Sequence, residues 1–558
     1  MVVKEIAWTI GGSDCSSGRG IQTDLKAMTG LAVHGCTVVT AIKAGNTLST
    51  SVVESVSIPA LRAQLHSLAD DLTPKATKVG YLASTKQIQT IVEFFEANKP
   101  HFLIYDPDFS ELPSAEVPTY TPDLLTTGSG NETLGALAQS PLDEFMRAVR
   151  EQLLPACHLL TVDLQEALTL LAIPAEQCPV FEDRGALDTF VEEIGLKLVA
   201  MGPKAVVIKG GERKGSFCQD YFTNGMTGLW LNSLKRTTQS ILGTGDTLSA
   251  SIAAAIASGN NILDSLVMAK SYVNQTLDQA PHIGRGTGPL GHASWTSEQS
   301  TLPWLTLTAE EGRHRLTFKP ANNIGFYPIV DSAEMVSQMV SSGVKHVQLR
   351  LKGLSATVLA EQIEEAARIC RQAGAELFVN DYSDLAIKYG AQGVHLGQAD
   401  LVSADLNRVA EAGLKLGITA KSYWEMARAL AFKPSYITVG PIFNDDAPDQ
   451  EAHHGLSQLI RWRKVLDFPL VAAGGIVYEN APGVLATGID SIAVHRDLSN
   501  QTDLPLRLEK WLRLFERRGV PSGIDRSFDA SVKFDNERPR ILHNASSDSP
   551  QSEGLNAV

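Results

Sequence analysis

Residues 11–24 read Gly-Gly-Ser-Asp-Cys-Ser-Ser-Gly-Arg-Gly-Ile-Gln-Thr-Asp and directly follow the apolar run Ile6–Ile10. A strand-length apolar run that passes through a glycine-rich turn into a helix-length stretch is typical of an α/β unit. The pattern predicts a doubly wound parallel sheet with helices on both faces, and an edge hairpin at 217–232. Five further apolar runs alternate with amphipathic stretches up to about residue 290, namely Cys36–Ile42, Ala76–Leu82, Phe102–Tyr105, His158–Val162 and Ala205–Ile208.

The second half of the chain has a different regularity. Eight apolar runs follow one another, most of them separated by enough residues for a helix: Gly325–Val330, His346–Leu349, Glu376–Val379, Gly393–Leu396, Lys415–Ile418, Tyr436–Val439, Leu470–Ala473 and Ser491–Val494. Eight such repeats predict a compact (β/α)8 TIM barrel. We therefore expect a first domain at 1–295, a linker without sustained periodicity at 296–323, a barrel at 324–518 and a disordered polar tail at 519–558. Segment 109–142, rich in Pro, Ser, Thr and Gly, is expected to be a long surface loop.

The composition narrows the function. The 558 residues include 48 Lys and Arg against 62 Asp and Glu, a formal net charge of −14, so the whole surface would repel nucleic acid and anionic membranes. The sequence offers no apolar stretch long enough to span a membrane and no signal-peptide pattern. Six scattered cysteines without a C-x-x-C pair favour a reducing cytoplasm over disulfides or zinc. We expect small-molecule partners and leave a homo-oligomer open.

A second glycine-rich element, Gly243-Thr244-Gly245-Asp246-Thr247, opens the apolar helix expected at Leu248–Ala257. Glycine-rich turns at helix starts leave backbone N–H groups aimed outward, which creates a site for anions. Asp246 is placed to accept the proton of an attacking alcohol while the amides hold a transferring phosphoryl group. Lys209, at the end of an apolar run, is placed to pair with nucleotide phosphates. Either glycine pattern alone also fits an ordinary turn, but the two in this order are more specific.

These elements, with Gly20–Lys26, Asn46-Thr47, Asp106-Pro107 and Gly284–Pro289, resemble the ribokinase-like kinases. Within that group, residues 5–292 resemble hydroxymethylpyrimidine (phosphate) kinases of thiamine biosynthesis. The resemblance implies a ribokinase-like sheet domain that uses ATP and Mg²⁺, with Asp246 as the catalytic residue. It implies a nucleotide and anion site of Lys209, Gly243, Thr244 and Gly245, and a pyrimidine side of Gly12, Asp24 and Asn46.

The chain departs from that family on the pyrimidine side. Arg19 stands where the family has a small residue, and Lys43-Ala44-Gly45-Asn46-Thr47 replaces Val-Ala-Gln-Asn-Thr. Two added cations would favour a phosphorylated or otherwise anionic substrate, unless both side chains point to solvent. Gly-Thr-Gly-Asp replaces Gly-Thr-Gly-Cys, as in the wider ribokinase group. The same reaction on an altered substrate is therefore an alternative.

Charged residues gather where the expected barrel strands end. Arg350 and Lys352 can project on one side of an extended segment. Asp381 and Asp400 follow successive strands, and their oxygens could hold one Mg²⁺. A metal and two cations would stabilise the charge that builds up on a departing pyrophosphate. A solvated loop explains a single charge well, but four charges after three successive strands argue for a site.

Residues 324–500 resemble thiamine-phosphate synthase, which joins hydroxymethylpyrimidine diphosphate to a thiazole phosphate and expels pyrophosphate. The resemblance implies contacts to the pyrimidine diphosphate from Gln348, Arg350, Lys352, Asn380 and Thr419, magnesium ligands Asp381 and Asp400, and a thiazole phosphate site at Gly475.

The thiazole side also departs from the family. Acidic residues at 444–449 replace a Thr-x-Thr-Lys loop, for which Arg496 could partly compensate, and His453-His454 is expected to be a solvated pair. The leading hypothesis is a bifunctional enzyme of thiamine assembly. The alternatives are altered substrates, or a ligand-sensing protein that has lost one or both activities.

Overall fold

The computed structural model describes residues 4–99, 102–109, 141–179, 183–211, 215–321, 324–443, 455–489, 491–499 and 503–516. Most of the loop expected at 109–142 and the whole tail expected at 519–558 lie outside the described residues. The acidic run 444–449 and His453-His454 lie outside them as well.

The first domain is a doubly wound sheet whose strands, as far as they are described, have the order β10-β9-β8-β7-β6-β5-β4-β1-β2-β3. In chain order its elements are β1 (Ile6–Asp14), α1 (Gly20–Gly30), β2 (His34–Gly45), β3 (Thr50–Ser55), α2 (Ile58–Ala69), β4 (Ala76–Val79), α3 (Thr85–Ala97), β5 (Leu103–Tyr105), α4 (Pro141–Ala148), the π-helical turn η1 (Val149–Leu153), α5 (Leu154–Ala156), β6 (Leu159–Val162), α6 (Leu164–Leu171), the 3-10 turn η2 (Ala175–Gln177), α7 (Arg184–Val199), β7 (Val206–Ile208), β8 (Phe217–Thr223), β9 (Gly228–Leu234), α8 (Thr244–Ala257), α9 (Ile262–Asp278), β10 (Trp304–Thr306) and α10 (Ala309–Arg313).

The apolar runs of the first half form the centre of this sheet. Strands β1, β2, β4, β5, β6 and β7 pair in parallel, and β4 and β6 are buried at every position. Helices cover both faces, which is why these strands are mostly apolar rather than alternating. The hairpin predicted at 217–232 is formed by the antiparallel strands β8 and β9. Both the doubly wound sheet and the edge hairpin are confirmed.

Two strands lie where the sequence pattern predicted none. β3 pairs antiparallel with β2 at the sheet edge and is mostly exposed, so it has no apolar run. β10 lies in segment 296–323, which we expected to be an irregular linker, and it pairs antiparallel with β9. The first sheet therefore extends past residue 295. The Trp304-Leu305-Thr306 strand is too short to produce a measurable periodicity.

The second domain is a closed barrel of β11 to β18 in sequence order, and each described pair of neighbouring strands is parallel. Each of the eight apolar runs forms one of these strands, which confirms the TIM barrel. Its elements are β11 (Phe326–Val330), α11 (Ala333–Ser341), β12 (His346–Leu349), α12 (Ala356–Ala373), β13 (Glu376–Asn380), α13 (Ser383–Tyr389), β14 (Gly393–Leu396), α14 (Asp400–Ser403), α15 (Leu406–Glu411), β15 (Lys415–Ala420), α16 (Tyr423–Ala431), β16 (Tyr436–Val439), α17 (Gly455–Val465), β17 (Leu470–Ala472), α18 (Ala481–Ala486), β18 (Ser491–Val494), α19 (Arg496–Ser499) and α20 (Leu504–Glu516).

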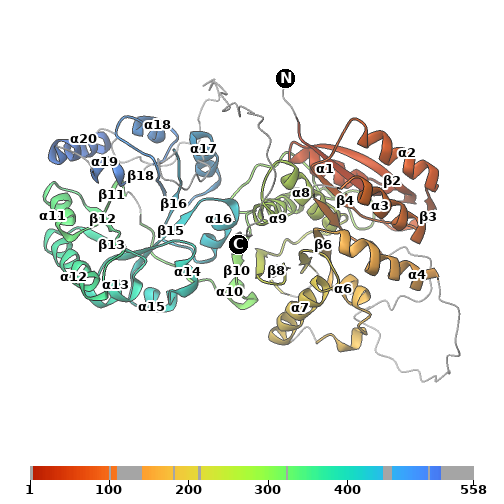
Figure 1. Cartoon of the computed structure of the whole chain (residues 1–558), viewed down its shortest axis with the longest axis horizontal. Helices are drawn as coiled ribbons and strands as arrows, with labels where there is room; N and C mark the ends of the chain where they lie inside the picture. Colours follow the sequence, from red (N-terminus) through yellow and green to blue (C-terminus); the bar gives the residue numbers. More distant parts are fainter. Residues whose placement is uncertain are drawn as a thin grey trace, which may run out of the picture.

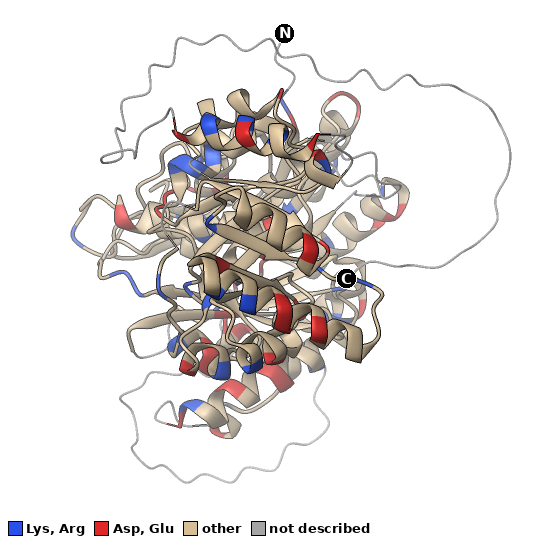
Figure 2. Ribbon diagram, turned by 90° about the vertical axis from the view of Figure 1, so that its left-hand side faces the viewer, with Lys and Arg blue, Asp and Glu red and all other residues tan. Residues whose placement is uncertain are grey.

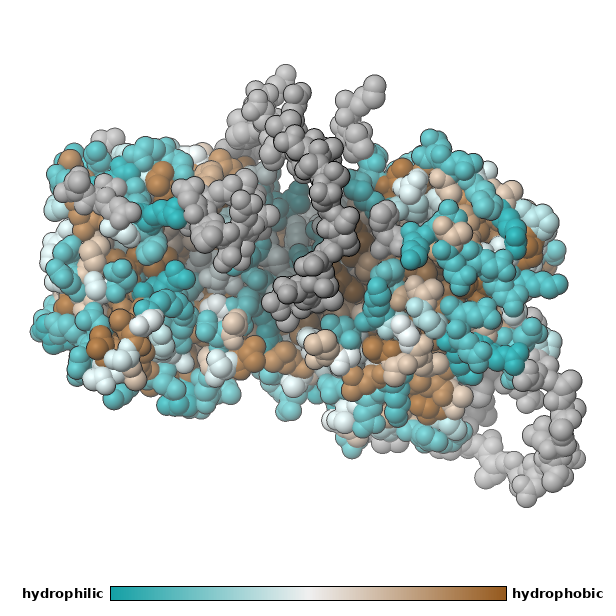
Figure 3. Space-filling model, in the orientation of Figure 1, coloured by the Kyte–Doolittle hydropathy of each residue, from teal (hydrophilic) through white to brown (hydrophobic). Residues whose placement is uncertain are grey.

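The two domains lie side by side and share buried surface. Figure 1 shows the barrel on the left, the sheet domain on the right, and α16, β10 and α10 where they meet. Buried residues of α8 and α9 belong to the same hydrophobic cluster as the buried residues of the barrel helices. Acidic and basic residues are interspersed over the helices seen in Figure 2, and hydrophilic residues cover most of the face in Figure 3. Among the described residues, no helix is long and apolar enough to cross a membrane.

Candidate active sites

The two glycine-rich elements of the first domain meet at one edge of the sheet. Gly243, at the start of α8, has a φ of 84°, and a Cβ there would lie 2.3 Å from the Gly18 carbonyl oxygen. Gly20 has a φ of 62°, and a Cβ there would lie 2.2 Å from the Gly12 oxygen. Only glycine allows this positive φ together with such close backbone approach. The turns predicted to bind anions are therefore packed against each other.

Asp246 lies in the first turn of α8 and joins both elements. Its Oδ2 accepts a hydrogen bond from the Gly20 N–H at 2.9 Å, and its Oδ1 lies 2.7 Å from Lys78 Nζ. The second carboxylate bound by Lys78 belongs to Asp24, at 2.6 Å from Nζ. Asp24 also accepts a hydrogen bond from the Thr9 hydroxyl at 2.5 Å. The structure thus brings together Asp246 and Asp24, two of the predicted site residues.

Lys78 is a residue of this site that the sequence prediction missed. It is fully buried in β4, and burial disfavours its charged form, but Asp24 and Asp246 outweigh that effect and raise its pKa above the ordinary value. Burial raises the pKa of Asp24 to about 7, against the effect of Lys78. A lysine inside the apolar run Ala76–Leu82 was the available signal, since a buried charge must be paired.

The predicted anion-binding lysine lies beside the same turn. Lys209 Nζ contacts Asp106 Oδ1 at 3.1 Å and Glu166 Oε2 at 3.4 Å, and a Cβ on Gly245 would lie 3.2 Å from it. Burial opposes the charge of Asp106, but Lys209 and Lys78 outweigh burial and hold its pKa below the usual value. Burial raises the pKa of Glu166 to about 8. Lys209 therefore lies beside Gly245 at the start of α8 while it is paired with two carboxylates.

The residues predicted on the pyrimidine side are placed differently from one another. Gly12 lies against Lys43, whose Cε is 2.9 Å from the position of an added Cβ. Asp24 is buried beneath the site with Lys78. Asn46 is exposed, and its Oδ1 accepts hydrogen bonds from the Leu48 and Ser49 amides at 2.8 and 3.2 Å. The structure therefore groups Gly12 with Lys43 and leaves Asn46 in an exposed turn.

The two added cations have different environments. Arg19 is exposed at the start of α1. Lys43 is buried, with Nζ 2.9 Å from Asp108 Oδ2 and 3.9 Å from the centre of the Tyr81 ring. Because Asp108 neutralises it, Lys43 adds a donor next to Gly12 without adding net positive charge. This pairing removes much of the reason to expect an anionic substrate.

In the barrel, the predicted diphosphate and metal residues lie at the carboxyl ends of successive strands. Lys352 Nζ is 2.5 Å from Asp381 Oδ2, and Asp381 has a φ of 69°, which turns it out of β13. Burial and the neighbouring Asp381 carboxylate raise the pKa of Asp400, the first residue of α14. Asn380 is buried at the end of β13, while Arg350 is exposed just after β12. The structure brings Lys352, Asp381 and Asp400 together.

A chain of hydrogen bonds inside the barrel connects two other predicted residues. Gln348 Nε2 donates to Tyr327 Oη at 3.4 Å, and that hydroxyl lies 2.8 Å from Tyr436 Oη. His395 joins Tyr436 Oη at 3.0 Å to the Thr419 hydroxyl at 2.8 Å. Burial lowers the pKa of His395 to about 4, so the ring is neutral at pH 7. The sequence prediction missed this histidine, although its place within an apolar strand was a signal.

The predicted thiazole side is described only in part. Gly475 has a φ of 60°, and a Cβ there would lie 2.7 Å from the Phe443 oxygen, so the turn after β17 packs on the turn after β16. Arg496 is exposed at the start of α19. Within the described part of the chain, no group of three or more His, Cys, Asp or Glu side chains could hold a metal. The Asp381–Asp400 pair would need further ligands from water or substrate oxygens.

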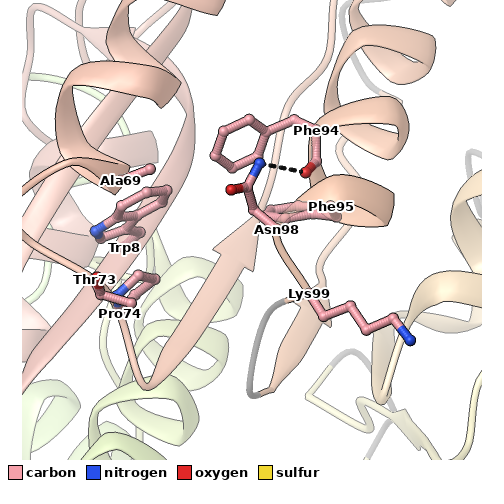
Figure 4. Close-up of a pocket in the computed structure, with 8 residues that line it drawn as sticks. All are labelled: Trp8, Ala69, Thr73, Pro74, Phe94, Phe95, Asn98 and Lys99. Carbon is pink, nitrogen blue, oxygen red and sulfur yellow. Dashed lines mark hydrogen bonds between the residues drawn. The ribbon is translucent and has the colours of Figure 1, made fainter.

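A separate pocket of about 240 Å³ lies away from both sites. Figure 4 shows Trp8, Phe94 and Phe95 around it, while Lys99 extends away and Asn98 bonds back to the Phe94 oxygen at 3.1 Å. These residues lie on α3 and near the start of β1, not at the carboxyl ends of the strands. Polar groups do not converge in it, so it does not define an active site.

The fold and these sites define a class of protein: a kinase domain of the doubly wound type joined to a TIM-barrel enzyme. The family model described as Phosphomethylpyrimidine kinase matches residues 14–115 and 137–291, and the one described as Thiamine monophosphate synthase matches residues 326–498. The chain belongs to the phosphomethylpyrimidine kinases in its first half and to the thiamine-phosphate synthases in its second.

Individual relatives agree with this assignment. A thiamine-phosphate synthase of Rhizobium etli is 44% identical over 189 residues, which cover 34% of this chain and 93% of that protein. A probable thiamine biosynthetic bifunctional enzyme of Oryza sativa, described as chloroplastic, is 26% identical over 504 residues, 88% of this chain and 85% of that protein. The comparisons confirm the predicted bifunctional enzyme of thiamine biosynthesis. Among solved structures, an ADP complex of Bacillus subtilis pyridoxal kinase is 27% identical, covers 52% of this chain and 98% of its own, and has a TM-score of 0.43.

We expect Lys78→Met to destabilise the first domain by about 3–5 kcal/mol, because it leaves Asp24 and Asp246 without their shared buried cation. Urea unfolding of the full chain, followed together with kinase turnover, measures this. Lys75→Met is the matched control, because Lys75 lies three residues before Lys78 and forms an exposed ion pair, with Glu5. Equal unfolding curves for the two variants would show that the ion pairs of Lys78 do not stabilise the first domain.

Proposed function

We propose that the first domain phosphorylates hydroxymethylpyrimidine or its monophosphate with ATP, and that the second joins the resulting diphosphate to a thiazole phosphate with release of pyrophosphate. The observation that carries the proposal is the position of Asp246, which is held by Lys78 and Gly20 at the start of α8 beside Lys209. A carboxylate, a lysine and a glycine-rich helix start that lie together are the parts that a phosphoryl-transfer site uses.

In the kinase reaction, the substrate hydroxyl would attack the γ-phosphorus of ATP and ADP would leave. Asp246 would accept the hydroxyl proton, and the amides of Gly243 to Gly245 with Lys209 would stabilise charge on the transferring group. Both Asp246 oxygens already have partners, so this carboxylate is held in a fixed orientation. An aspartate is a weak base, and most of the acceleration would come from positioning.

In the synthase reaction, Arg350 and Lys352 would bind the diphosphate, and Asp381 and Asp400 would hold Mg²⁺. Two adjacent carboxylates, one with a raised pKa, suit a divalent cation because it relieves their repulsion. When bound, Mg²⁺ would supply charge stabilisation for the departing pyrophosphate. Lys352, now paired with Asp381, would be free to turn to the diphosphate once that charge is balanced. Gln348, Asn380 and Thr419 would orient the pyrimidine, and Gly475 and Arg496 would bind the thiazole phosphate.

An altered first substrate is the second candidate, and the Lys43–Asp108 pair bears on it. The pair combines a hydrogen-bond donor and an acceptor beside Gly12. An aminopyrimidine has a ring nitrogen that accepts next to an amino group that donates, so the pair suits this ring better than an extra phosphate.

The six cysteines are free thiols, which supports our proposal of a reducing, cytoplasmic setting.

The direct test of both halves is separate complementation of a kinase-deficient and a synthase-deficient thiamine auxotroph by the full chain. Growth of both strains without thiamine is the expected result. Purified protein should also form ADP in a pyrimidine-dependent manner. ADP formation only with another alcohol would favour the altered substrate, and no turnover in either half would favour a ligand sensor.

We expect Asp246→Asn to lower kinase turnover by roughly 100-fold or more, since the proton acceptor is lost. Synthase turnover with supplied pyrimidine diphosphate and thiazole phosphate should stay at the wild-type level. Both rates are measured on the same full-chain preparation. A parallel loss of the two activities would contradict a role for Asp246 confined to phosphoryl transfer.

Asp381→Asn should raise the Mg²⁺ concentration needed for half-maximal synthase turnover by about tenfold or more, on the scale of lost metal-site groups. The Mg²⁺ dependence of the kinase reaction should not change. Asp384→Asn, on the exposed surface of α13 and paired only with Arg408 among its described contacts, is the matched control. An unaltered Mg²⁺ titration would remove Asp381 from the metal site.

Lys43→Met should raise the KM for the pyrimidine by roughly 10-fold or more, the scale of a hydrogen bond to a charged group, and leave the KM for ATP unchanged. Lys197→Met, exposed on α7, provides the control. An unchanged KM for the pyrimidine in Lys43→Met, together with turnover of a different alcohol, would instead support the altered-substrate hypothesis.

A further inference from the structure

Helix α16 of the barrel is covered on its outer side by the first domain. Six consecutive residues, Met426–Ala431, are buried, although the outer face of a TIM-barrel helix normally faces water. The covering elements are α9 and β10. Arg428 is 6% exposed and donates to the Leu305 oxygen of β10 at 3.4 Å. The junction therefore runs along the whole of α16.

The start of α16 is bound by an acidic side chain from the other domain. Asp264, in the first turn of α9, accepts a hydrogen bond from the Trp424 N–H at 2.8 Å through Oδ1. Its Oδ2 accepts one from the Asn261 side chain at 3.0 Å, and the residue is 8% exposed. The carboxylate lies between the amino ends of two helices, where negative charge is most favourable. Asp264 thus acts as a cap for α16 in addition to Ser422, whose hydroxyl is 3.5 Å from the Glu425 N–H.

The first turn of α16 is in turn bonded to the carboxyl end of β15, where Thr419 lies. Gln398 Nε2 donates to the Thr419 oxygen at 2.8 Å and to the Glu425 oxygen at 3.4 Å. The Lys421 N–H donates to Glu425 Oε2 at 2.6 Å. Thr419 itself is held through its hydroxyl by His395. A displacement of the helix start would therefore be transmitted to the Thr419 backbone.

We propose that Asp264 of the kinase domain is a positioning residue for the synthase reaction: by capping α16 it fixes the helix start that Gln398 joins to Thr419 at the end of β15. The inference rests on the proposed synthase function. Asp264 touches none of the predicted substrate groups, so its effect is indirect. The docked kinase domain is then a working part of the synthase, and not merely joined to it by a linker.

The test compares full-chain Asp264→Ala with wild type, using supplied pyrimidine diphosphate and thiazole phosphate so that the kinase step is not needed. We expect the KM for the pyrimidine diphosphate to rise between roughly 2-fold and 30-fold, the range for a lost helix cap, with kinase turnover unchanged. Asp264→Asn keeps an oxygen acceptor and should stay within about twofold of wild type. Asp183→Ala, which removes the cap of α7 within the kinase domain, is the matched control.

Two results would overturn the proposal. One is a folded Asp264→Ala protein with wild-type KM and kcat. The other is a lower kcat with both Michaelis constants unchanged, because loss of stability alone reduces only the amount of active enzyme. If Asp264→Ala does not fold, Arg428→Met tests the same junction from the barrel side, and a wild-type KM in that variant would also overturn the proposal. A wild-type chain without synthase turnover would instead refute the proposed function.

Discussion

Parallel strands that are buried on both faces leave only their carboxyl ends for charged chemistry, and both domains are built around this constraint. An ionised side chain within such a strand is costly unless a partner balances it. Lys78 in β4 meets that condition through Asp24 and Asp246. His395 in β14 meets it differently, by remaining neutral between two hydroxyl groups. In each domain a buried polar residue therefore supports the site from below, while residues in the loops beyond the strand ends face the substrate.

The sequence predicted what depends on local pattern. Each apolar run formed a strand, because strands that are buried on both faces consist mostly of apolar residues, and the barrel followed from eight such runs. Edge strands β3 and β10 were missed, since one is exposed and the other has three residues. A short edge strand forms because it pairs with a neighbouring strand, and a local sequence pattern contains no information about that pairing. The same limit hid the Lys78 partners, because Asp246 is 168 residues away in the chain.

The site residues divide in the same way, into those that a local sequence pattern marks and those that depend on contacts between distant parts of the chain. Asp246, Lys209, Asp381 and Asp400 could be proposed from the sequence because glycine turns and strand ends mark them. The charge of Lys43 was visible, but its neutralisation by Asp108 depends on a contact between β2 and the residues after β5, two strands that β1 and β4 separate in the sheet. A sequence motif shows which groups are present, whereas net charge in a pocket depends on pairs formed across strands. Lys43 as a free cation would suggest an anionic ligand; Lys43 paired with Asp108 suggests a ring with both a donor and an acceptor.

The junction shows what distinguishes this chain from a barrel that functions alone. The Rhizobium etli synthase has the length of the second domain only, since this chain covers 93% of it over 189 residues. In a barrel without a docked first domain, a helix such as α16 would expose its outer face, whereas here Met426–Ala431 are buried and α16 packs against α9 and β10. Burial of the apolar side chains on that face stabilises the junction. The hydrogen bond from the Trp424 N–H to Asp264 depends on orientation, so it adds a specificity that apolar contact lacks. The hydrophobic contact holds the domains together, and the Asp264 carboxylate fixes where the first turn of α16 meets α9, which is the turn that Gln398 joins to Thr419 at the end of β15.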